Sequence, residues 1–290
     1  MYFKSKLSAH STLYSLSRNL HRKYCKATHF LHSKPTYLII GAAKCGTSSL
    51  HEYLMQNPCV GRVLTKQLHF YDLYYNRGMA WYKVCLPFVW EKFYVKNILK
   101  KNYATGEATA HYLNHPTSPK RVAETLPNVK IIVMLRNPID RAYSHYQMEF
   151  NNGNEELSFE DAIDIEPDRI NGEIEKIATD ETYLSKNYPH RAYLNGSMYA
   201  EQLKRWFEYF PKEQFHFVKT EDFNENPSRI YNDVLKFLDL PNYELSEYKK
   251  FRERKYEKMN PETRSKLSSF FKSFNEELYS LTGIDFKWKD

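Results

Sequence analysis

One short segment constrains this chain more than any other, and it reads GAAKCGTSSL at residues 41–50. An apolar run at 37–40 precedes it, and a predicted helix at 48–56 follows it and stops at Asn57-Pro58. A strand, a tight loop and a helix N-terminus together bind phosphate-like anions, because the loop amides point inward and the helix dipole is positive there. A plain strand-to-helix turn is the alternative reading of the same residues.

The position of the lysine narrows the choice of anion. Gly41 and Gly46 keep the Gly-x4-Gly spacing of a nucleoside-triphosphate loop, but such a loop has lysine directly after the second glycine. Here that place is taken by Thr47, and the lysine is Lys44. A triphosphate loop needs a lysine that reaches the β- and γ-phosphates and a hydroxyl on magnesium. The forward lysine therefore favours a shorter anion and disfavours a small-molecule kinase.

Together with this loop, a second segment carries a resemblance to a known family. Residues 44–50 resemble the 5′-phosphosulfate loop of sulfotransferases that use 3′-phosphoadenylyl sulfate (PAPS). Residues 130–146, KIIVMLRNPIDRAYSHY, are similar to the 3′-phosphate motif of the same family: a buried strand, an arginine, and a serine eight residues further along a helix. The resemblance implies PAPS as co-substrate, with no metal required. It also implies that the binding roles fall on Lys44, Cys45, Gly46, Thr47, Ser48, Ser49, Arg136 and Ser144.

Elementary physics agrees with this assignment for the second segment. The continuous apolar run at 131–135 is expected of a strand that is covered on both faces. Pro138 fits the first turn of a helix, where its missing N–H is not needed. Arg136 would then leave the strand end facing a helix start, and its guanidinium can give forked hydrogen bonds to a phosphate. The alternative interpretation of Arg136, taken alone, is a surface arginine at the end of a strand.

Further stretches resemble the carbohydrate branch of the family, the heparan-sulfate-type enzymes and their bacterial relatives. The resemblance covers about residues 36–290. It implies an α/β fold of three αβα layers, with a central parallel sheet and a P-loop-like phosphosulfate-binding loop. It also implies transfer of a sulfonyl group to a hydroxyl or amine of an acceptor, a carbohydrate or polysaccharide. The stretches lie at residues 66–72, 78–82, 106–112, 196–199 and 281–288.

The acceptor must lose a proton, and the residue that takes it stays open at this point. In the heparan-sulfate-type enzymes a glutamate base follows the lysine that corresponds to Lys66. This sequence has Gln67 there, and an amide cannot accept a proton near neutral pH. His69 ranks first as a replacement because its ordinary pKa suits the task, ahead of Glu107, with Asp72 as the third candidate. Lys66, Gln67 and His69 are also expected to bind substrate, and a purely structural role is the alternative for His69.

Two less regular stretches follow. Residues 151–190 are acidic and polar, and we expect them to form an excursion near the acceptor cleft, with one helix at about 159–163. Residues 249–255, KKFRERK, precede the last helices. In the resembled family a basic loop in this place closes over the 3′-phosphate, which makes Arg254 the candidate here. A solvated charged turn is the alternative.

Length and charge divide the chain into two parts. Its 290 residues are 42% hydrophobic, which is ample for one large α/β domain at 36–290. Residues 1–35 hold seven Lys and Arg and no Asp or Glu, so this leader accounts for the whole net charge of +7. A nucleic-acid-binding protein usually carries its excess charge on the folded domain, so we expect no nucleic-acid partner. The chain has four cysteines, and their spacing fits reduced thiols in a cytosol-like compartment and no metal site.

The leader has no apolar run near eighteen residues, so we expect no transmembrane span. Leu13, Leu16, Leu20 and Tyr24 fall at helical spacing between basic residues. This pattern favours a basic amphipathic segment that rests on an anionic membrane surface, and hence a cytoplasmic protein that is peripheral at a membrane. A solvated tail and an organellar presequence are the other readings.

Two functions compete with carbohydrate sulfation. The first is sulfation of a lipid or another small alcohol, which the same cofactor motifs would serve. The second comes from a different class: a PAPS-binding pseudoenzyme that recruits partners at a membrane, which Gln67 and the basic leader favour.

Overall fold

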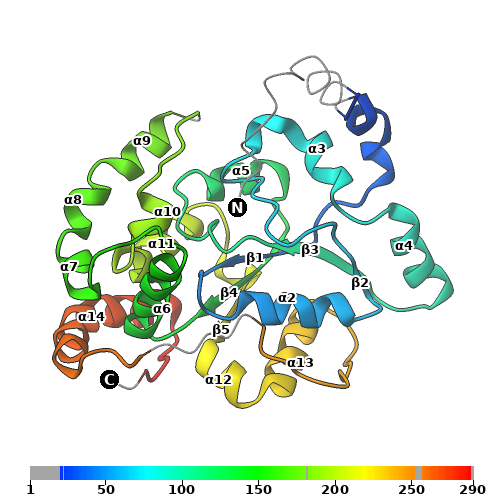
Figure 1. Cartoon of the computed structure of the whole chain (residues 1–290). Helices are drawn as coiled ribbons and strands as arrows, with labels where there is room; N and C mark the ends of the chain where they lie inside the picture. The colour runs from blue at the N-terminus through cyan, green and yellow to red at the C-terminus, as the bar shows by residue number, and fades with distance from the viewer. Residues whose placement is uncertain (1–19, 22, 181, 252–256, 289–290) are drawn as a thin grey trace.

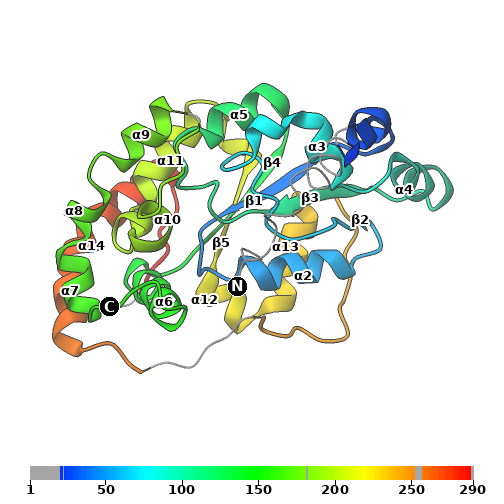
Figure 2. The ribbon, with the colours of Figure 1, turned by 45° about the horizontal axis from the view of Figure 1, so that its top comes forward.

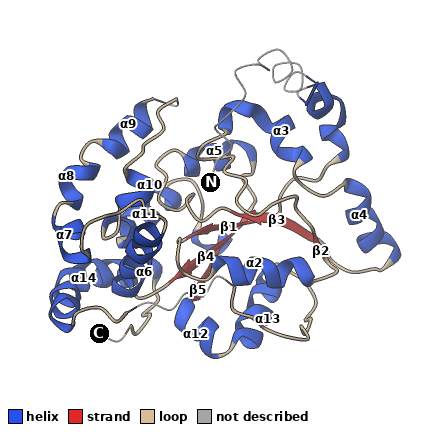
Figure 3. Ribbon diagram, in the orientation of Figure 1, coloured by secondary structure: helices blue, strands red, loops and turns tan. Residues whose placement is uncertain are grey.

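A parallel sheet of five strands forms the centre of the structure, with the strand order β2-β3-β1-β4-β5 (Figure 3). The structure is a computed structural model, and it describes residues 20–21, 23–180, 182–251 and 257–288. The strands are β1 (Tyr37–Gly41), β2 (Val60–Gly61), β3 (Ala104–Ala108), β4 (Lys130–Leu135) and β5 (Phe215–Lys219). Each neighbouring pair is parallel; Tyr37, for example, is in register with Gly106 on one side and Lys130 on the other.

Helices cover both faces of this sheet (Figures 1 and 2). Helices α2, α12 and α13 lie on the lower face in Figure 1, and α3, α5 and α11 lie on the upper face. Because both faces are covered, every residue of β1 is buried, as the apolar run at 37–40 predicts. The predicted three-layer α/β fold is therefore confirmed.

Helices connect the successive strands, and the longest connection, between β4 and β5, contains α6 to α11. Their bounds are α2 (Thr47–Gln56), α3 (Gly78–Val84), α4 (Val89–Phe93), α5 (Ser118–Thr125), α6 (Pro138–Asn151), α7 (Phe159–Asp164), α8 (Glu166–Ile170), α9 (Glu173–Thr179), α10 (Tyr188–Arg191), α11 (Tyr199–Phe207), α12 (Thr220–Glu225), α13 (Pro227–Phe237) and α14 (Pro261–Thr282). Short turns of 3₁₀-helix lie at η1 (His29–Leu31), η2 (Tyr75–Arg77), η4 (Asn195–Ser197) and η5 (Lys212–Gln214), and η3 (Tyr94–Ile98) is a π-helix.

Three of the helices begin at the same dipeptide, Asn-Pro. The side chains of Asn137, Asn226 and Asn260 each accept a hydrogen bond from a backbone N–H in the first turn of α6, α13 and α14. The proline that follows has no N–H that would need a hydrogen-bond partner, and its ring already fixes φ near the helical value. Local sequence therefore sets the start of α6, and so the place where its residues meet the end of β4.

Beside the sheet, α6 to α10 and α14 form a second packed group (Figure 1). Its core joins Ile139 and Tyr146 of α6, Phe159 of α7, and Leu267 and Phe271 of α14. This group contains the acidic stretch 151–190. The structure confirms the helix predicted near 159–163 as α7, and it adds α8, α9 and α10, which the sequence did not predict.

The described N-terminal residues form a short helix at 23–28 that leads into η1. Residues 1–19, and with them much of the proposed amphipathic leader, lie outside the described part of the chain. Among the described residues, none of the helices is both long enough and apolar enough to cross a bilayer. Cys25, Cys45, Cys59 and Cys85 are free thiols.

Candidate active site

The predicted anion loop joins β1 to α2, as the sequence predicts. Gly46 is the residue before the helix and has φ of +87°, a conformation that favours glycine. A Cβ on Gly46 would also lie 3.4 Å from Cε of Met134 on β4. Lys44 has φ of +74°, so the loop turns sharply on both sides of Cys45. The turn brings the N-terminus of α2 to the end of the sheet, where backbone N–H groups are available to an anion.

The surrounding framework holds the carbonyl groups of this loop. The buried hydroxyl of Thr220 lies 2.9 Å from the carbonyl oxygen of Cys45 and 2.8 Å from that of Leu135, at the end of β4. The guanidinium of Arg141 donates from Nε to the carbonyl oxygen of Ala43 at 3.2 Å. The loop is thus fixed to β4, α6 and α12, which keeps its geometry rigid.

A cavity of about 480 Å³ lies against this loop. Its wall joins the loop to the segment after α2, the ends of β3 and β4, one face of α6, and α12. The lining residues are Ala43, Lys44, Gly46, Thr47, Ser48, Ser49, Lys66, Gln67, Ala110, His111, Arg136, Ser144, Gln147, Met148, Glu149, His190, Thr220, Asn224, Lys250 and Phe251.

Most of the residues predicted to bind the cofactor meet at this cavity. Lys44, Arg136 and Ser144 lie on its wall, although they come from three separate elements of the chain. The described lining contains the four cations Lys44, Lys66, Arg136 and Lys250, and a single carboxylate, Glu149. Such a wall attracts an anion, and several donors on it can bind phosphate oxygens.

Lys66 lies next to the helix start. Its Nζ donates a hydrogen bond to Oγ of Ser48 in the first turn of α2. Burial lowers the pKa of the neighbouring His51 to about 4, and the charge of Lys66 acts in the same direction. Lys66 therefore adds its charge to the positive end of α2, at the same place as Lys44.

Of the residues predicted to bind the cofactor, Cys45 lies away from the cavity and Arg254 is not among the described residues. The side chain of Cys45 is buried, packs 3.9 Å from the hydroxyl of Tyr199, and does not line the cavity. Burial raises the pKa of its thiol. Arg254 lies outside the described residues. Of the same basic stretch, Lys250 and Phe251 line the cavity, and the N–H of Phe251 donates to Oγ of Ser49 at 3.0 Å.

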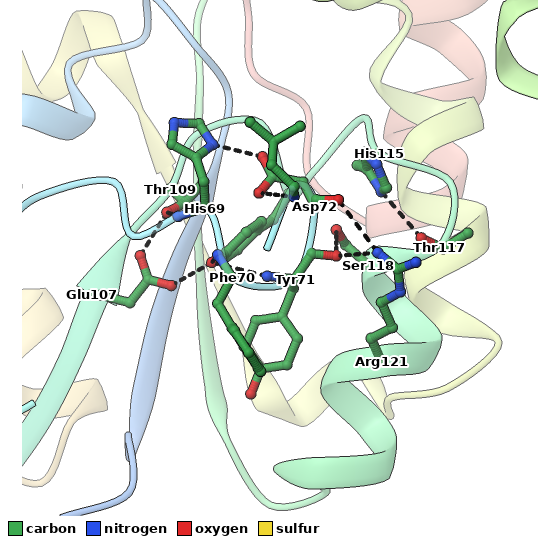
Figure 4. A network of polar contacts seen from close by, with 12 residues as sticks. His69, Phe70, Tyr71, Asp72, Glu107, Thr109, His115, Thr117, Ser118 and Arg121 are labelled. Carbon is green, nitrogen blue, oxygen red and sulfur yellow. Dashed lines mark hydrogen bonds and ion pairs between the residues drawn. The ribbon is translucent and has the colours of Figure 1, made fainter. Parts of the chain in front are cut away.

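His69 and Asp72 form a close pair (Figure 4), which lies next to His111 of the cavity wall, although neither residue lines the cavity itself. Nδ1 of His69 lies 2.7 Å from Oδ2 of Asp72, and Asp72 is buried. Burial opposes the charge on each group, but the hydrogen bond and the mutual attraction outweigh it. The pKa of His69 is therefore raised, and that of Asp72 is lowered. The ring of His69 packs 5.7 Å from the ring of His111, which lines the cavity.

The backbone at His69 and Gln67 is strained. The two residues have φ of +51° and +60°, a region that bulky residues seldom occupy. The N–H of Gln67 donates to the carbonyl oxygen of Ala108 at 3.1 Å, and that of His69 donates to Oγ1 of Thr109 at 3.3 Å. The end of β3 thus holds this segment in a costly conformation, which is a common feature of functional sites.

Glu107, one of the predicted bases, lies in the interior and does not line the cavity. Its carboxylate accepts hydrogen bonds from Oγ1 of Thr109 and from the hydroxyl of Tyr112, each at 2.7 Å. Burial raises the pKa of Glu107 to about 7, against the effect of these two hydrogen bonds. Figure 4 shows the carboxylate of Glu107 directed at Thr109, while the ring of His69 points the other way, toward Asp72. This geometry gives Glu107 a supporting position and leaves His69 and Asp72 nearer the cavity.

Sequence analysis missed several residues of the wall. His111 follows the end of β3, the edge at which ligands bind in open parallel sheets, and this signal could have identified it. Burial lowers the pKa of His111 to about 4. Glu149 and His190 form a second pair, with 3.0 Å between Oε2 and Nδ1. Because α10 was not predicted, the position of His190 beside Glu149 was not accessible from the sequence.

Among the described residues, no group of three or more His, Cys, Asp or Glu side chains is placed to hold a metal ion.

Comparisons with known proteins identify the family of the chain. The family model described as the sulfotransferase domain matches residues 34–290. The chain is 28% identical over 321 residues to the membrane-associated sulfotransferase kil1 of Dictyostelium discoideum, across 88% of this chain and 67% of that protein. It is 27% identical over 279 residues to heparan sulfate glucosamine 3-O-sulfotransferase 5 of Homo sapiens, across 88% and 74%.

A crystal structure shows the same likeness in three dimensions. The sulfotransferase from Alicyclobacillus acidocaldarius superposes with a TM-score of 0.66 and is 30% identical, covering 87% of this chain and 97% of that one. Residues 34–290, which the family model matches, contain the donor loop, the Arg136 segment and the His69 segment. This chain belongs to the sulfotransferase family of enzymes.

Proposed function

We propose that this enzyme transfers the sulfonyl group of PAPS to a hydroxyl or amine of a carbohydrate acceptor. The observation that carries the proposal is the meeting of Lys44, Arg136 and Ser144 at one cation-rich cavity. The names of relatives that modify heparan sulfate glucosamine support a glycan acceptor. A lipid or small-alcohol acceptor stays as an outcome of the test below.

The described residues of the cavity fit such a donor. Thr47, Ser48 and the amides at the start of α2 would hold the 5′-phosphate, and Arg136 with Ser144 would hold the 3′-phosphate. PAPS supplies an activated sulfur atom, at which the bond to the 5′-phosphate oxygen breaks as the bond to the acceptor forms. Lys44 would stabilise the negative charge that grows on the leaving oxygen. The protein's contribution is mainly position and charge.

The proton of the acceptor would go to Nε2 of His69. Asp72 holds the other ring nitrogen, so it fixes the ring orientation and stabilises the imidazolium that forms, as the acid does in a catalytic triad. Glu107 would act at a distance, through the backbone of the His69 segment. Lys66 and Gln67 line the cavity and would contact the sulfonate or the acceptor.

The direct test uses the full chain, radiolabelled PAPS and a panel of desulfated glycans. We expect label on a glycan, and we expect adenosine 3′,5′-bisphosphate to bind and inhibit. Bisphosphate binding with no transfer to glycans, lipids or small alcohols would favour the pseudoenzyme. Binding of ATP and magnesium without binding of the bisphosphate would overturn the proposal.

We also propose a cytoplasmic enzyme in which residues 1–35 form a leader that rests on an anionic membrane and 36–290 form the catalytic domain. The seven basic residues of the leader support this, as does the name of the relative described as membrane-associated. Deletion of residues 1–35 should lower co-sedimentation with anionic vesicles and leave sulfate transfer intact. Unchanged co-sedimentation would reject this role of the leader.

A further inference from the structure

A short protruding unit, α4 with the π-helix η3 (residues 89–98), exposes an unusual number of large apolar side chains. Trp90 is 51% exposed, Phe93 62%, Tyr94 54% and Ile98 61%. Val95 is the one residue of the unit that is buried, and it packs against the main core. A helix at the surface of a globular domain normally turns its aromatic residues toward the core. In α4 and η3 these residues face outward instead.

The exposed apolar residues are arranged along the helix. Trp90 is three residues from Phe93 and four from Tyr94, and Ile98 is four residues beyond Tyr94, so these side chains gather on one side of the unit. Phe88, just before α4, stacks on Trp90 with ring centroids 4.0 Å apart. The side chains thus form one continuous apolar strip, which we call the α4 strip.

Exposed lysines lie in and directly after the unit that carries the α4 strip. Lys92, Lys96, Lys100 and Lys101 are all exposed, whereas Glu91 is the single acidic residue between positions 88 and 103. A protein partner would be expected to avoid lysine, which is depleted at the centre of protein interfaces. Tryptophan, tyrosine and lysine together suit the boundary of a lipid bilayer. There the rings sit at headgroup depth and the lysine stems reach outward to anionic lipids.

The position of the strip is compatible with catalysis on a membrane. Figures 1 and 2 place α4 at the β2 edge of the sheet. The donor loop lies at the start of α2, which is the end of α2 farther from this edge. His32 forms a backbone bridge with Phe88, with 4.2 Å between the two ring centroids. Phe30, two residues earlier, is 63% exposed. The chain that leads in from the basic N-terminal segment therefore passes beside the α4 strip.

We propose that the α4 strip is a membrane-binding surface, which inserts Trp90, Phe93, Tyr94 and Ile98 into the headgroup region of an anionic bilayer. The four lysines bind the anionic headgroups. This surface is distinct from residues 1–35, and it would keep the donor cavity open to the aqueous side.

The test is co-sedimentation of the full chain with vesicles of phosphatidylcholine alone or with phosphatidylserine. One variant, W90S/F93S/I98S, removes the apolar strip, and a second, K92Q/K96Q/K100Q/K101Q, removes the charge. The matched controls are Leu184→Ser, which replaces an apolar side chain that is 62% exposed elsewhere, and Lys272→Gln. Calorimetry with adenosine 3′,5′-bisphosphate checks that each variant is folded, since none of the changed residues lines the cavity.

We expect the wild type to bind the mixed vesicles and each strip variant to lose more than about tenfold in partition. Both controls should bind as the wild type does, and Trp90 fluorescence should shift to the blue on vesicle addition. Binding of W90S/F93S/I98S equal to that of the wild type would overturn the inference. So would dependence of binding on residues 1–35 alone, or a dimer that the same variant abolishes without any vesicle binding. Loss of sulfate transfer with normal vesicle binding would count against the proposed function only.

Discussion

The buried carboxylate of Glu107 accepts a hydrogen bond from the hydroxyl of Tyr112 at 2.7 Å. The same hydroxyl accepts from the N–H of Phe70 at 2.9 Å, and the second partner of Glu107, Thr109, accepts from the N–H of His69 at 3.3 Å. Both routes end on the backbone beside the proposed base. Glu107 is therefore a positioning residue, and its influence on His69 passes through Tyr112 and Thr109.

The burial of Glu107 predicts that the stability of the protein depends on pH and that Glu107→Gln weakens this dependence. The folded pKa of Glu107 is about 7, above the ordinary value of 4.5, so the folded protein holds a proton that the unfolded chain releases. Its contribution to stability is full below about pH 4.5 and is lost as the pH rises through about 7. The loss is on the order of 3 kcal/mol. We expect the Tm of Glu107→Gln to fall less than that of the wild type between pH 5 and pH 8.

The matched control is Glu166→Gln, because burial also raises the pKa of Glu166 to about 7, but this residue lies on α8. Both variants should flatten the dependence of Tm on pH, while only Glu107→Gln should alter kcat. If Glu107→Gln leaves both the Tm profile and kcat unchanged, Glu107 neither titrates in this range nor positions the His69 segment.

The proposed base predicts a shift in the pH profile of the reaction. Asp72 raises the pKa of His69, and a base must be neutral, so kcat should rise with pH through the pKa of His69. In Asp72→Asn the pKa of His69 falls, so the acidic limb should move to lower pH while the plateau drops. His69→Ala should lower kcat by about a hundredfold or more and leave bisphosphate affinity within a factor of two or so. A profile that does not move in Asp72→Asn contradicts the pair.

A substitution of Gln67 tests the assignment of the base by a gain of activity. Its side chain lines the cavity at the place where the resembled enzymes have a glutamate base. In a His69→Ala background, Gln67→Glu adds a carboxylate near Lys66, and we expect part of kcat to return. Gln67→Asn is the control, because it changes the side chain without adding a base. Equal activity of the two double variants would show that position 67 is too far from the acceptor.

The positions of strands and of the donor loop could be predicted from the sequence, because they depend on local patterns. The apolar runs that become β1 and β4 lie within one residue or so of the predicted bounds. Glycine, lysine and hydroxyl spacing at 41–50 indicated the donor loop for the same reason. Asn-Pro fixed the start of α6, which places Ser144 on the same cavity wall as Arg136.

The positions of residues that depend on long-range packing could not be predicted from the sequence. Glu107 was predicted as a base because it is acidic and ends a strand, but alternation along β3 cannot show that Tyr112 and Thr109 cover it. No local pattern shows that the aromatic residues of α4 are exposed and that Val95 of η3 reaches the core. His190 required α10 to fold back onto α6, a contact that no local pattern specifies.

Donor affinity should depend more on the geometry of Arg136 than on its charge. The forked guanidinium can give two parallel hydrogen bonds to a phosphate, and an ammonium cannot. We expect Arg136→Lys to weaken bisphosphate binding by roughly tenfold and Arg136→Gln by about a hundredfold. Calorimetry would measure both. Arg191→Lys is the control, because Arg191 lies outside the donor cavity. Wild-type affinity in Arg136→Lys would show that position 136 supplies only charge.

The donor loop depends on Thr220 for its rigidity. Its hydroxyl is within hydrogen-bond distance of the carbonyl oxygens of Cys45 and Leu135, and it can donate to one of them at a time. Thr220→Val keeps the shape but removes the donor, so a buried carbonyl loses its partner, at about 1–3 kcal/mol. Because one of these carbonyls belongs to the loop, bisphosphate affinity should fall together with the free energy of unfolding in urea. Thr220→Ser keeps the hydroxyl and should retain affinity, although it loses a buried methyl group. A Thr220→Val protein that is less stable but binds the bisphosphate as the wild type does would show that the loop holds its shape without this tether.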